Sequence, residues 1–282
     1  MKLFIDIGGT HLRSEIHGLK DIVYEKLPSS DHDLIHFIEK CLTSYPDICF
    51  IGISYAGQVY NGEILSSPNI TVSETKIKDH FESRYPLRLE IDNDLNCAVM
   101  AEAESLREEN IAALYVGTGL GSAVIDQGKL IRGYRNQAFE LGHIPYREAP
   151  FLCGCGKNNC IELFASGSAI KKWVAHYAPE YESIFASKVT LENLKNSQDE
   201  KILPMFEEAL VYSAAIVITL FNPEVLVLGG GIMLSNTYLK EIITRNIDKY
   251  ALSEALKDVK ICISTIDDAP LQGALLLKDY NG

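Results

Sequence analysis

Three glycine-rich turns, each at the end of an apolar strand-like run, constrain the fold of this chain more than any other feature. They read "DIGGT" at 6–10, "GTGLG" at 117–121 and "LGGG" at 228–231. Glycines at a strand end let backbone N–H groups approach phosphate oxygens closely. None of the turns matches the dinucleotide pattern G-x-G-x-x-G or the P-loop. One such turn is more often a plain connection, but three of them together favour phosphate binding.

Strands alternate with helices along the whole chain, which predicts an α/β fold around a central sheet. The predicted strands are 2–8, 47–54, 87–92, two strands within 111–125, 224–231 and 260–264. The predicted helices are 31–42, 93–106, 205–222, 235–247 and 269–280. Two strand-rich halves, each opening on a glycine turn, predict two lobes with a cleft between them. The best candidate for the boundary between the halves is "REEN" at 107–110.

The composition excludes several classes of protein. Among the 282 residues, 26 are basic and 38 acidic, which gives a formal net charge of −12. A chain this acidic has no generic attraction for nucleic acid or for an anionic membrane. No segment reaches the roughly 18 uninterrupted apolar residues of a membrane span, and the N-terminus does not have the pattern of a signal peptide. We therefore expect a cytoplasmic protein without nucleic-acid or membrane partners.

Seven cysteines without a signal peptide indicate a reducing compartment, where a disulfide framework is unexpected. Cys153, Cys155 and Cys160 stand at C-x-C-x4-C spacing, and His143 lies ten residues upstream. Three thiolates and one imidazole make the closed tetrahedral set of a structural zinc site. A loop of unliganded thiols remains the alternative. The other four cysteines lie in apolar segments and are predicted to fill the core: Cys41, Cys49, Cys97 and Cys262.

Taken together, the motifs resemble those of the ROK family of sugar kinases. They are "DIGGT", "SPN" (67–69), "DND" (92–94), "GTGLG", "ELGH" (140–143), "CGCGKNNCIE" and "LGGG", in that order. The resemblance implies a two-lobed actin-like (ribonuclease H-like) ATPase fold with a nucleotide and sugar cleft. It predicts an N-terminal lobe of residues 1–108, on which the C-terminal helix 269–282 packs back. The C-terminal lobe would be 109–268 and would carry the zinc loop.

Phosphoryl transfer to an alcohol needs a carboxylate near the attacking hydroxyl and a cradle for the triphosphate. Asp94, where strand 87–92 meets its helix, is the predicted general base, although one residue of 92–94 is also expected to cap the helix. The sugar-binding residues that the resemblance implies are Gly57, Asn69, Asn93, Asp94, Glu140, His143 and Glu162. Those implied for ATP and Mg²⁺ are Asp6, which would lie near the metal, Gly8, Gly9, Thr10, Gly117, Thr118, Gly119, Gly229 and Gly230. The metal set is His143, Cys153, Cys155 and Cys160.

Two residues depart from the family pattern. Phe139 stands where glycine usually precedes the glutamate of "ELGH", and Asn136 also stands where glycine is common. Phe139 is predicted to narrow or reshape the sugar pocket, which leaves the identity of the sugar open. The resemblance implies an ATP-dependent hexose kinase, with glucose as the default acceptor and N-acetylglucosamine or N-acetylmannosamine as the alternative. It also implies a homodimer. A sugar-responsive regulator is the second class, but the acidic chain opens directly on its first glycine turn at residue 6.

Overall fold

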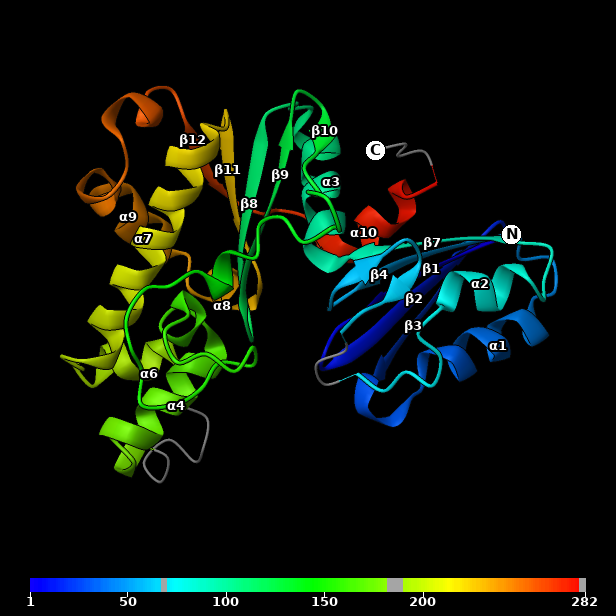
Figure 1. Cartoon of the computed structure of the whole chain (residues 1–282), viewed down its shortest axis with the longest axis horizontal. Coiled ribbons are helices and arrows are strands. Elements are labelled where there is room, and N and C mark those ends of the chain that lie inside the picture. Colours follow the sequence, from blue (N-terminus) through cyan, green and yellow to red (C-terminus); the bar gives the residue numbers. More distant parts are fainter. Residues whose placement is uncertain (67–69, 182–189, 279–282) are drawn as a thin grey trace. The chain divides into compact units, whose positions relative to one another are not determined.

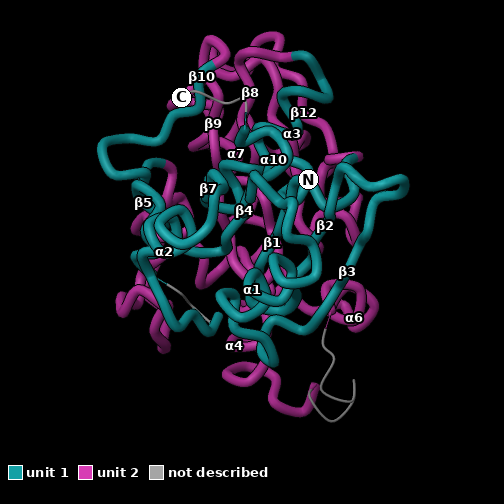
Figure 2. The backbone as a smooth tube through the Cα atoms, turned by 90° about the vertical axis from the view of Figure 1, so that its right-hand side faces the viewer, with its two compact units in different colours: residues 1–107, 129–138, 266–282 teal, residues 108–128, 139–265 magenta. Residues whose placement is uncertain are grey.

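The computed structural model describes residues 1–66, 70–181 and 190–278 (Figure 1). The chain divides into two compact units (Figure 2). Unit 1 comprises Met1–Arg107, Lys129–Ala138 and Ile266–Gly282, and unit 2 comprises Glu108–Gly128 and Phe139–Thr265. The segment 129–138, which the sequence-based boundaries assign to the second lobe, thus belongs to unit 1.

Unit 1 is built on a five-stranded sheet of order β3-β2-β1-β4-β7. Strand β1 pairs with β4 and β4 with β7 in parallel, whereas β2 and β3 add an antiparallel edge. The bounds are β1 Lys2–Ile7, β2 His11–His17, β3 Val23–Pro28, β4 Phe50–Tyr55 and β7 Arg88–Asn93. Strands β5 Val59–Tyr60 and β6 Glu63–Ile64 form a separate two-stranded ribbon.

Helices cover both faces of this sheet, so β1 and β4 are apolar almost throughout. The helices are α1 Leu34–Ser44, α2 Ile77–Glu82, α3 Asp94–Leu106 and α10 Ala269–Leu276, with a 3-10 turn η1 at Ser29–Asp31. Leu3 and Ile5 of β1 face the core cluster that α1 and α2 complete, whereas Phe4 packs with Leu271 of α10. Helix α10 packs closely on α3, because a Cβ at Gly273 would strike the carbonyl of Cys97.

The second sheet has the order β10-β9-β8-β11-β12. Its strands β8 Ile111–Val116, β9 Leu120–Asp126, β11 Val225–Gly229 and β12 Lys260–Ile263 belong to unit 2, whereas the residues of β10 Lys129–Leu130 belong to unit 1. Strands β8, β11 and β12 are parallel, and β9 is antiparallel to β8. The helices are α4 Gly167–Tyr177, α6 Leu191–Asn196, α7 Ile202–Phe221, α8 Gly231–Ser235 and α9 Tyr238–Asn246. Short 3-10 turns are η2 Leu141–His143, η3 Ile161–Leu163, η4 Ile247–Lys249 and η5 Ser253–Leu256.

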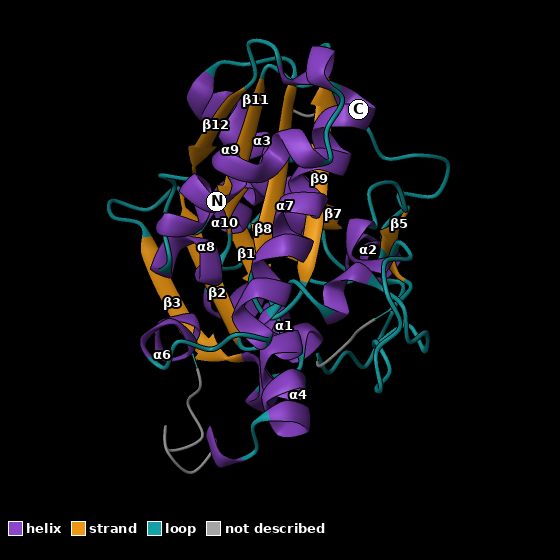
Figure 3. Cartoon of the chain, turned by 90° about the vertical axis from the view of Figure 1, so that its left-hand side faces the viewer, coloured by secondary structure: helices purple, strands orange, loops and turns teal. Residues whose placement is uncertain are grey.

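Helix α7 runs along one face of the second sheet (Figure 3) and contacts β8 and β9. Within the described ranges it is the one helix long and apolar enough to cross a membrane, by length and composition only. It also contacts α4, α6 and α9, and 56% of its most apolar window is buried. A core helix of a folded unit has these properties.

All seven cysteines are free thiols. Cys41 and Cys97 are buried, as predicted, and burial raises the pKa of the Cys41 thiol to about 11. The prediction was wrong for Cys49, which is exposed and donates to the carbonyl of Met1 at 3.4 Å. Its segment is apolar, but the residue lies just before β4, outside the buried part of the strand.

Candidate functional site

Three polar side chains lie near the carboxyl ends of the parallel strands of unit 1. The sheet register places Asp6 of β1 opposite Ser54 of β4, and Ser54 opposite Asp92 of β7. All three side chains are buried, although the strands that carry them are otherwise apolar. In open α/β sheets, ligands bind outside the carboxyl ends of the strands. This edge of the sheet is therefore the candidate site of unit 1.

Asp6 is anchored inside this edge. Its Oδ1 accepts a hydrogen bond from Ser54 Oγ at 2.7 Å, and its Oδ2 accepts one from Arg13 Nη1 at 2.9 Å. Arg13 also forms an ion pair with Asp268 at 3.2 Å. Burial raises the pKa of Asp6 to about 6, although Ser54 and Arg13 both favour the charged form. Asp6 therefore connects β1 to β4 and to β2 just before the first glycine turn.

The turn after β1 is the first glycine turn. Gly8 N–H donates to the carbonyl of His11 at 3.0 Å, and the carbonyl of Thr10 accepts from Ser29 N–H at 3.1 Å. These bonds close the turn against the start of β2 and against η1. Gly9 and Thr10 lie exposed at its tip, where their backbone can meet a ligand.

Asn93 is the N-cap of α3, and Asp94 is the first residue of that helix. Asn93 Oδ1 accepts from the N–H groups of Leu95 at 2.9 Å and Asn96 at 3.3 Å. Asn93 Nδ2 donates to the carbonyl of Gly57 at 3.1 Å. The expectation that one of residues 92–94 caps the helix is thus confirmed, and the cap fixes the backbone from which the Asp94 side chain, half-buried, projects.

Gly57 has a steric reason to be glycine. A Cβ there would lie 2.5 Å from the carbonyl oxygen of Ser66 and 2.6 Å from the Tyr55 ring. The residue therefore brings its carbonyl within reach of Asn93 without a side chain in between. The remaining sugar-site residue predicted for this unit, Asn69, lies outside the described residues.

In unit 2, the turn 117–119 joins β8 to β9 and is held from two sides. Gly117 N–H donates to the carbonyl of Gly119 at 3.0 Å. The N–H groups of Gly167 and Ser168, at the start of α4, donate to the carbonyls of Gly117 at 2.8 Å and Thr118 at 3.0 Å. The turn is therefore preorganised, and Thr118 is exposed at its tip.

Glu162 holds the other side of this turn. Its Oε2 accepts from the backbone N–H of Leu120 at 3.0 Å. A Cβ at Gly119 would lie 2.7 Å from the same oxygen, so a larger residue there would displace the Glu162 carboxylate. Its Oε1 accepts from Cys153 Sγ at 3.6 Å. Glu162 thus connects the cysteine loop to the glycine turn, a contact that sequence spacing gives no means to predict.

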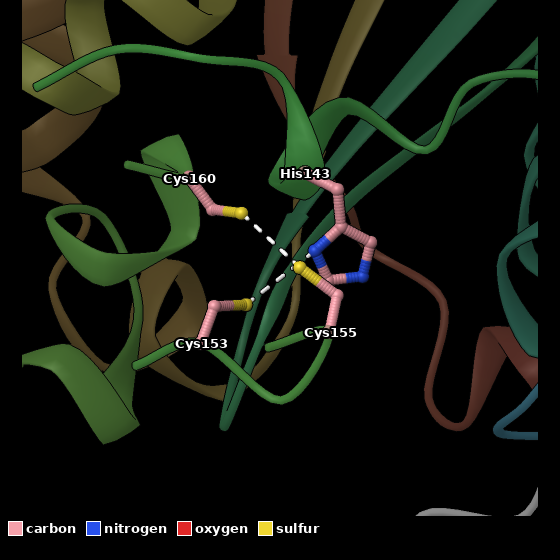
Figure 4. A group of neighbouring side chains, drawn as sticks. All are labelled: His143, Cys153, Cys155 and Cys160. Atoms are coloured by element: carbon pink, nitrogen blue, oxygen red, sulfur yellow. Dashed lines mark hydrogen bonds between the residues drawn. The ribbon is translucent and has the colours of Figure 1, made fainter. Parts of the chain in front are cut away.

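The cysteine loop brings its four predicted ligands together. Figure 4 shows the side chains of His143, Cys153, Cys155 and Cys160 pointing toward one another, with His143 Nδ1 on the side of the sulfur atoms. Their ligand atoms all lie within 4.8 Å of one another. The Cys155 and Cys160 sulfurs are 3.3 Å apart, and Cys153 Sγ is 3.5 Å from His143 Nδ1. Three thiols and an imidazole at this separation suit a tetrahedral zinc ion.

The opposite nitrogen of His143 points away from the sulfur atoms. His143 Nε2 lies 3.9 Å from Glu140 Oε2, three residues earlier in the chain. The Glu140 side chain is 43% exposed and that of His143 is 35% exposed. Both are thus accessible to a ligand, whereas the thiols of Cys153 and Cys160 are buried. One imidazole can therefore serve a metal with one nitrogen and a ligand with the other.

Gly229 ends β11 and Gly230 is the N-cap of α8. A Cβ at Gly229 would strike the Tyr115 ring, and one at Gly230 would lie 2.6 Å from the Val116 carbonyl oxygen. Gly230 also has a positive φ of 84°, which other residues rarely adopt. Both glycines are explained by the close packing of β11 on β8, and a contact with adenosine stays a prediction.

The carboxylate of Asp92 has the most protein donors at this edge of unit 1, and our sequence reasoning missed its role. It accepts hydrogen bonds from the side chains of Asn96, Arg132 and Asn136. A signal was present in "DNDLN", since Asp92 and Asn96 stand at i and i+4 across the start of a helix. The contribution of Arg132 and Asn136, forty or more residues later, carries no such signal.

The chain matches the model of the ROK family over residues 3–280. The N-acetyl-D-glucosamine kinase of Aliivibrio fischeri is 30% identical over 275 residues, which cover 88% of this chain and 89% of that protein. The glucokinase of Thermotoga maritima is 25% identical over 299 residues, which cover 96% of this chain and 94% of that protein. The structure of a ROK-family glucokinase from Streptomyces griseus, in complex with glucose and AMPPNP, covers 99% of both chains with a TM-score of 0.77 at 23% identity.

These likenesses extend over both units and nearly the whole length of the chain. The agreement with the Streptomyces griseus structure confirms the predicted α/β fold. The match of the family model from residue 3 to residue 280 includes nearly all of both units. This protein belongs to the ROK family.

Proposed function

We propose that this protein is an ATP-dependent hexose kinase that transfers the γ-phosphate of ATP to a sugar hydroxyl, the 6-hydroxyl in the first instance. The observation that carries the proposal is the position of Asp94, an acid held by a capped helix start at the carboxyl end of a parallel strand. The similarity to a named N-acetylglucosamine kinase and a named glucokinase over most of the chain supports it. A cytoplasmic homodimer is part of the same proposal.

Asp94 acts as the general base. Its carboxylate takes the proton of the acceptor hydroxyl while that oxygen attacks the γ-phosphorus. A bond forms between the sugar oxygen and phosphorus, and the bond from phosphorus to the β,γ-bridging oxygen breaks, so that ADP leaves. Asn93 uses its carbonyl oxygen to cap α3 and one amide hydrogen to reach Gly57. The second amide hydrogen is then available to donate to a sugar hydroxyl.

The two glycine turns receive the phosphates of ATP. Gly8, Gly9 and Thr10 form one cradle at the end of β1. Gly117, Thr118 and Gly119 form the other, in which the carbonyls of Gly117 and Thr118 already accept hydrogen bonds from the start of α4. Gly229 and Gly230 lie against the adenosine. Backbone amides fixed in such turns stabilise phosphate charge without rearrangement during the reaction.

Mg²⁺ would accompany the phosphates and spread their charge. Both oxygens of Asp6 already accept hydrogen bonds, from Ser54 and Arg13. This arrangement fits a metal that Asp6 meets through water better than one that it binds directly. Asp6 therefore orients the phosphate turn and the solvent next to it.

Glu140, His143 and Glu162 provide the sugar contacts of unit 2. A zinc ion held by His143 Nδ1, Cys153, Cys155 and Cys160 would be structural, since four protein ligands leave no open position. Metal at Nδ1 keeps the hydrogen of His143 on Nε2, where it can donate to a sugar hydroxyl or to Glu140. Glu162 has less capacity to accept hydrogen bonds from a sugar than predicted, because one of its oxygens already accepts from Leu120 N–H.

Glucose remains the default acceptor, and N-acetylglucosamine is the alternative that the 30% identity to an N-acetylglucosamine kinase favours. A coupled ADP-release assay across glucose, mannose, fructose, N-acetylglucosamine and N-acetylmannosamine decides between them. We expect one hexose to exceed the others in kcat/KM. If ATP and Mg²⁺ support phosphorylation of none of these sugars, the proposed function is wrong.

The role of Asp94 has its own test. Asp94→Asn keeps the size of the side chain but cannot accept the proton, so kcat should fall by roughly 10²-fold or more. Binding of ATP and of the best sugar, measured by calorimetry, should change little. Glu104→Gln is the matched control, because Glu104 is an exposed acid on the same helix. Near-normal turnover of Asp94→Asn would leave Asp94 only a structural part of the helix start.

A further inference from the structure

Asp92 is the most heavily bonded carboxylate at the proposed catalytic edge of unit 1. It is 3% exposed. Its Oδ2 accepts from Arg132 Nη2 at 2.7 Å and from Arg132 Nε at 3.1 Å. Its Oδ1 accepts from Asn93 N–H at 2.7 Å, Asn96 Nδ2 at 2.8 Å and Asn136 Nδ2 at 2.9 Å. A buried carboxylate with a two-point arginine contact and three further donors is rigidly held.

Asn136 adds a second anchor to the same group. Its amide nitrogen also donates to the carbonyl of Val59 at 2.9 Å, and its Oδ1 accepts from Asn96 Nδ2 at 3.1 Å. The residue has a φ of 58°, in the left-handed region. Asparagine tolerates this conformation better than most residues but less well than glycine. In this left-handed conformation the chain thus carries a side chain with three polar contacts.

We call Asp92, Asn96, Arg132 and Asn136 the Asp92 network. It brackets Asp94 along the chain, because Asp92 lies two residues before it and Asn96 two residues after it. Asp92 also binds the backbone N–H of Asn93, the residue that caps α3. The backbone on both sides of Asp94 is therefore tied to one buried group, and that group is tied to segment 129–138.

We propose that Arg132 and Asn136 are positioning residues for Asp94, acting through Asp92 and Asn96. This inference rests on the proposed kinase function. A displacement of a catalytic group by as little as 1 Å can cost on the order of 10²-fold in rate. Without the network, Asp94 would keep its identity but lose the fixed direction of its carboxylate toward the acceptor hydroxyl.

Asn136→Gly tests the proposal, because it removes the amide while it permits the same positive φ. We expect kcat with the best sugar to fall by about 10-fold or more, and KM for ATP to stay within about twofold. Arg132→Lys keeps the charge but loses the two-point contact, and should give a smaller loss of the same kind. Hydrogen exchange of the Leu95 and Asn96 amides, which the cap protects, should become faster in both variants.

Asn61→Gly is the matched control. Asn61 also has a positive φ, of 50°, but it is exposed in the turn between β5 and β6. The Asn61→Gly variant should leave kcat and the hydrogen exchange of the Leu95 and Asn96 amides unchanged. If Asn136→Gly lowers the melting temperature but leaves kcat as in wild type, the network only holds segment 129–138 and the inference is overturned. A wild type that phosphorylates no sugar would instead count against the proposed function, while the exchange result still reports on the network.

Discussion

At the scale of single residues, sequence predicted best where the chemistry is local. The spacing of Cys153, Cys155 and Cys160 predicted a cluster, and the structure brings their sulfur atoms together with His143. The capping role of a residue in "DND" was also predictable, because caps depend on neighbours within four positions. The contact of Glu162 with Leu120 N–H was not, since the two residues are 42 positions apart and meet only in the folded unit.

Phe139 shows what a departure from a family pattern can mean. Its φ is 66°, in the left-handed region that glycine adopts far more readily than phenylalanine. Its ring packs on Phe221 at the end of α7, with centroids 4.3 Å apart and planes at 61°. The expectation that the ring itself shapes the sugar pocket has no support in this contact. Residue 139 would therefore affect the choice of acceptor sugar through the backbone conformation that it imposes on Glu140, the next residue.

We predict that Phe139→Gly changes the ranking of acceptor sugars more than it changes KM for ATP. Relief of the left-handed backbone, worth about 1 kcal/mol, should roughly offset the loss of an aromatic pair of similar size. The free energy of unfolding in urea should therefore change by less than about 1 kcal/mol. The decisive measurement is kcat/KM for each sugar in the two proteins.

Phe221→Leu provides the comparison, because it removes the ring partner and leaves the backbone of residue 139 as it is. If Phe221→Leu alters the ranking as much as Phe139→Gly does, the ring contact is responsible. An unchanged ranking in both variants would mean that residue 139 has no part in the choice of sugar.

At the scale of elements, the sheet that carries the site was predicted in part. Strands β1, β4 and β7 were predicted, and β1 and β4 have the continuous apolar runs of strands covered on both faces. Strand β2 was missed although Leu12, Ser14 and Ile16 alternate as buried positions. Strand β3 has no such signal, since it is an edge strand with no buried residue. Helix α1 was predicted from residue 31 but begins at Leu34, because Asp33 is its N-cap.

Zinc bound in the cysteine loop should also stabilise the glycine turn before β9. Purified protein should contain about one zinc per chain. Removal of zinc by a chelator should raise amide hydrogen exchange in the loop 143–162 and also at Leu120. The reason is that Glu162, which accepts from Leu120 N–H, follows the last cysteine by only two residues. KM for ATP should rise together with that exchange.

Mass spectrometry of exchanged peptides provides the measurement, with zinc content determined in parallel. Peptides from β1 and β4 in unit 1 serve as the internal control and should be unaffected. Exchange that increases only within 143–162, with Leu120 unchanged, would show that the glycine turn is stable without the metal. Fresh protein that contains no zinc would contradict the metal site itself.

At the scale of the whole chain, sequence predicted two halves from two sets of strands and glycine turns. The inclusion of segment 129–138 in unit 1 could not be predicted in this way. It depends on hydrogen bonds from Arg132 and Asn136 to one buried carboxylate, and these side chains are ordinary loop residues in the sequence. Composition contributes at this scale too, because a net charge of −12 affects the stability of the molecule as a whole.

The last prediction concerns the pH dependence of stability. Burial raises the pKa of Asp6 from 3.8 to about 6, so between these values the folded chain holds a proton that the unfolded chain has released. Stability contributed by this proton is present at low pH and is lost as pH rises through about 6. Asp6→Asn cannot titrate. As the pH rises from about 4 to about 6, the variant should therefore gain stability relative to wild type, by roughly 3 kcal/mol at most, and above that pH the difference should stay constant.

Urea unfolding of the two proteins without nucleotide, at several pH values, measures this difference. Both proteins also lose self-repulsion as the pH approaches the isoelectric point of 5.1, so the comparison cancels that effect. Asp21→Asn, which removes an exposed acid of unit 1, is the control and should follow wild type closely. A difference between Asp6→Asn and wild type that stays constant with pH would mean that Arg13 and Ser54 keep Asp6 charged throughout and that burial does not dominate its pKa.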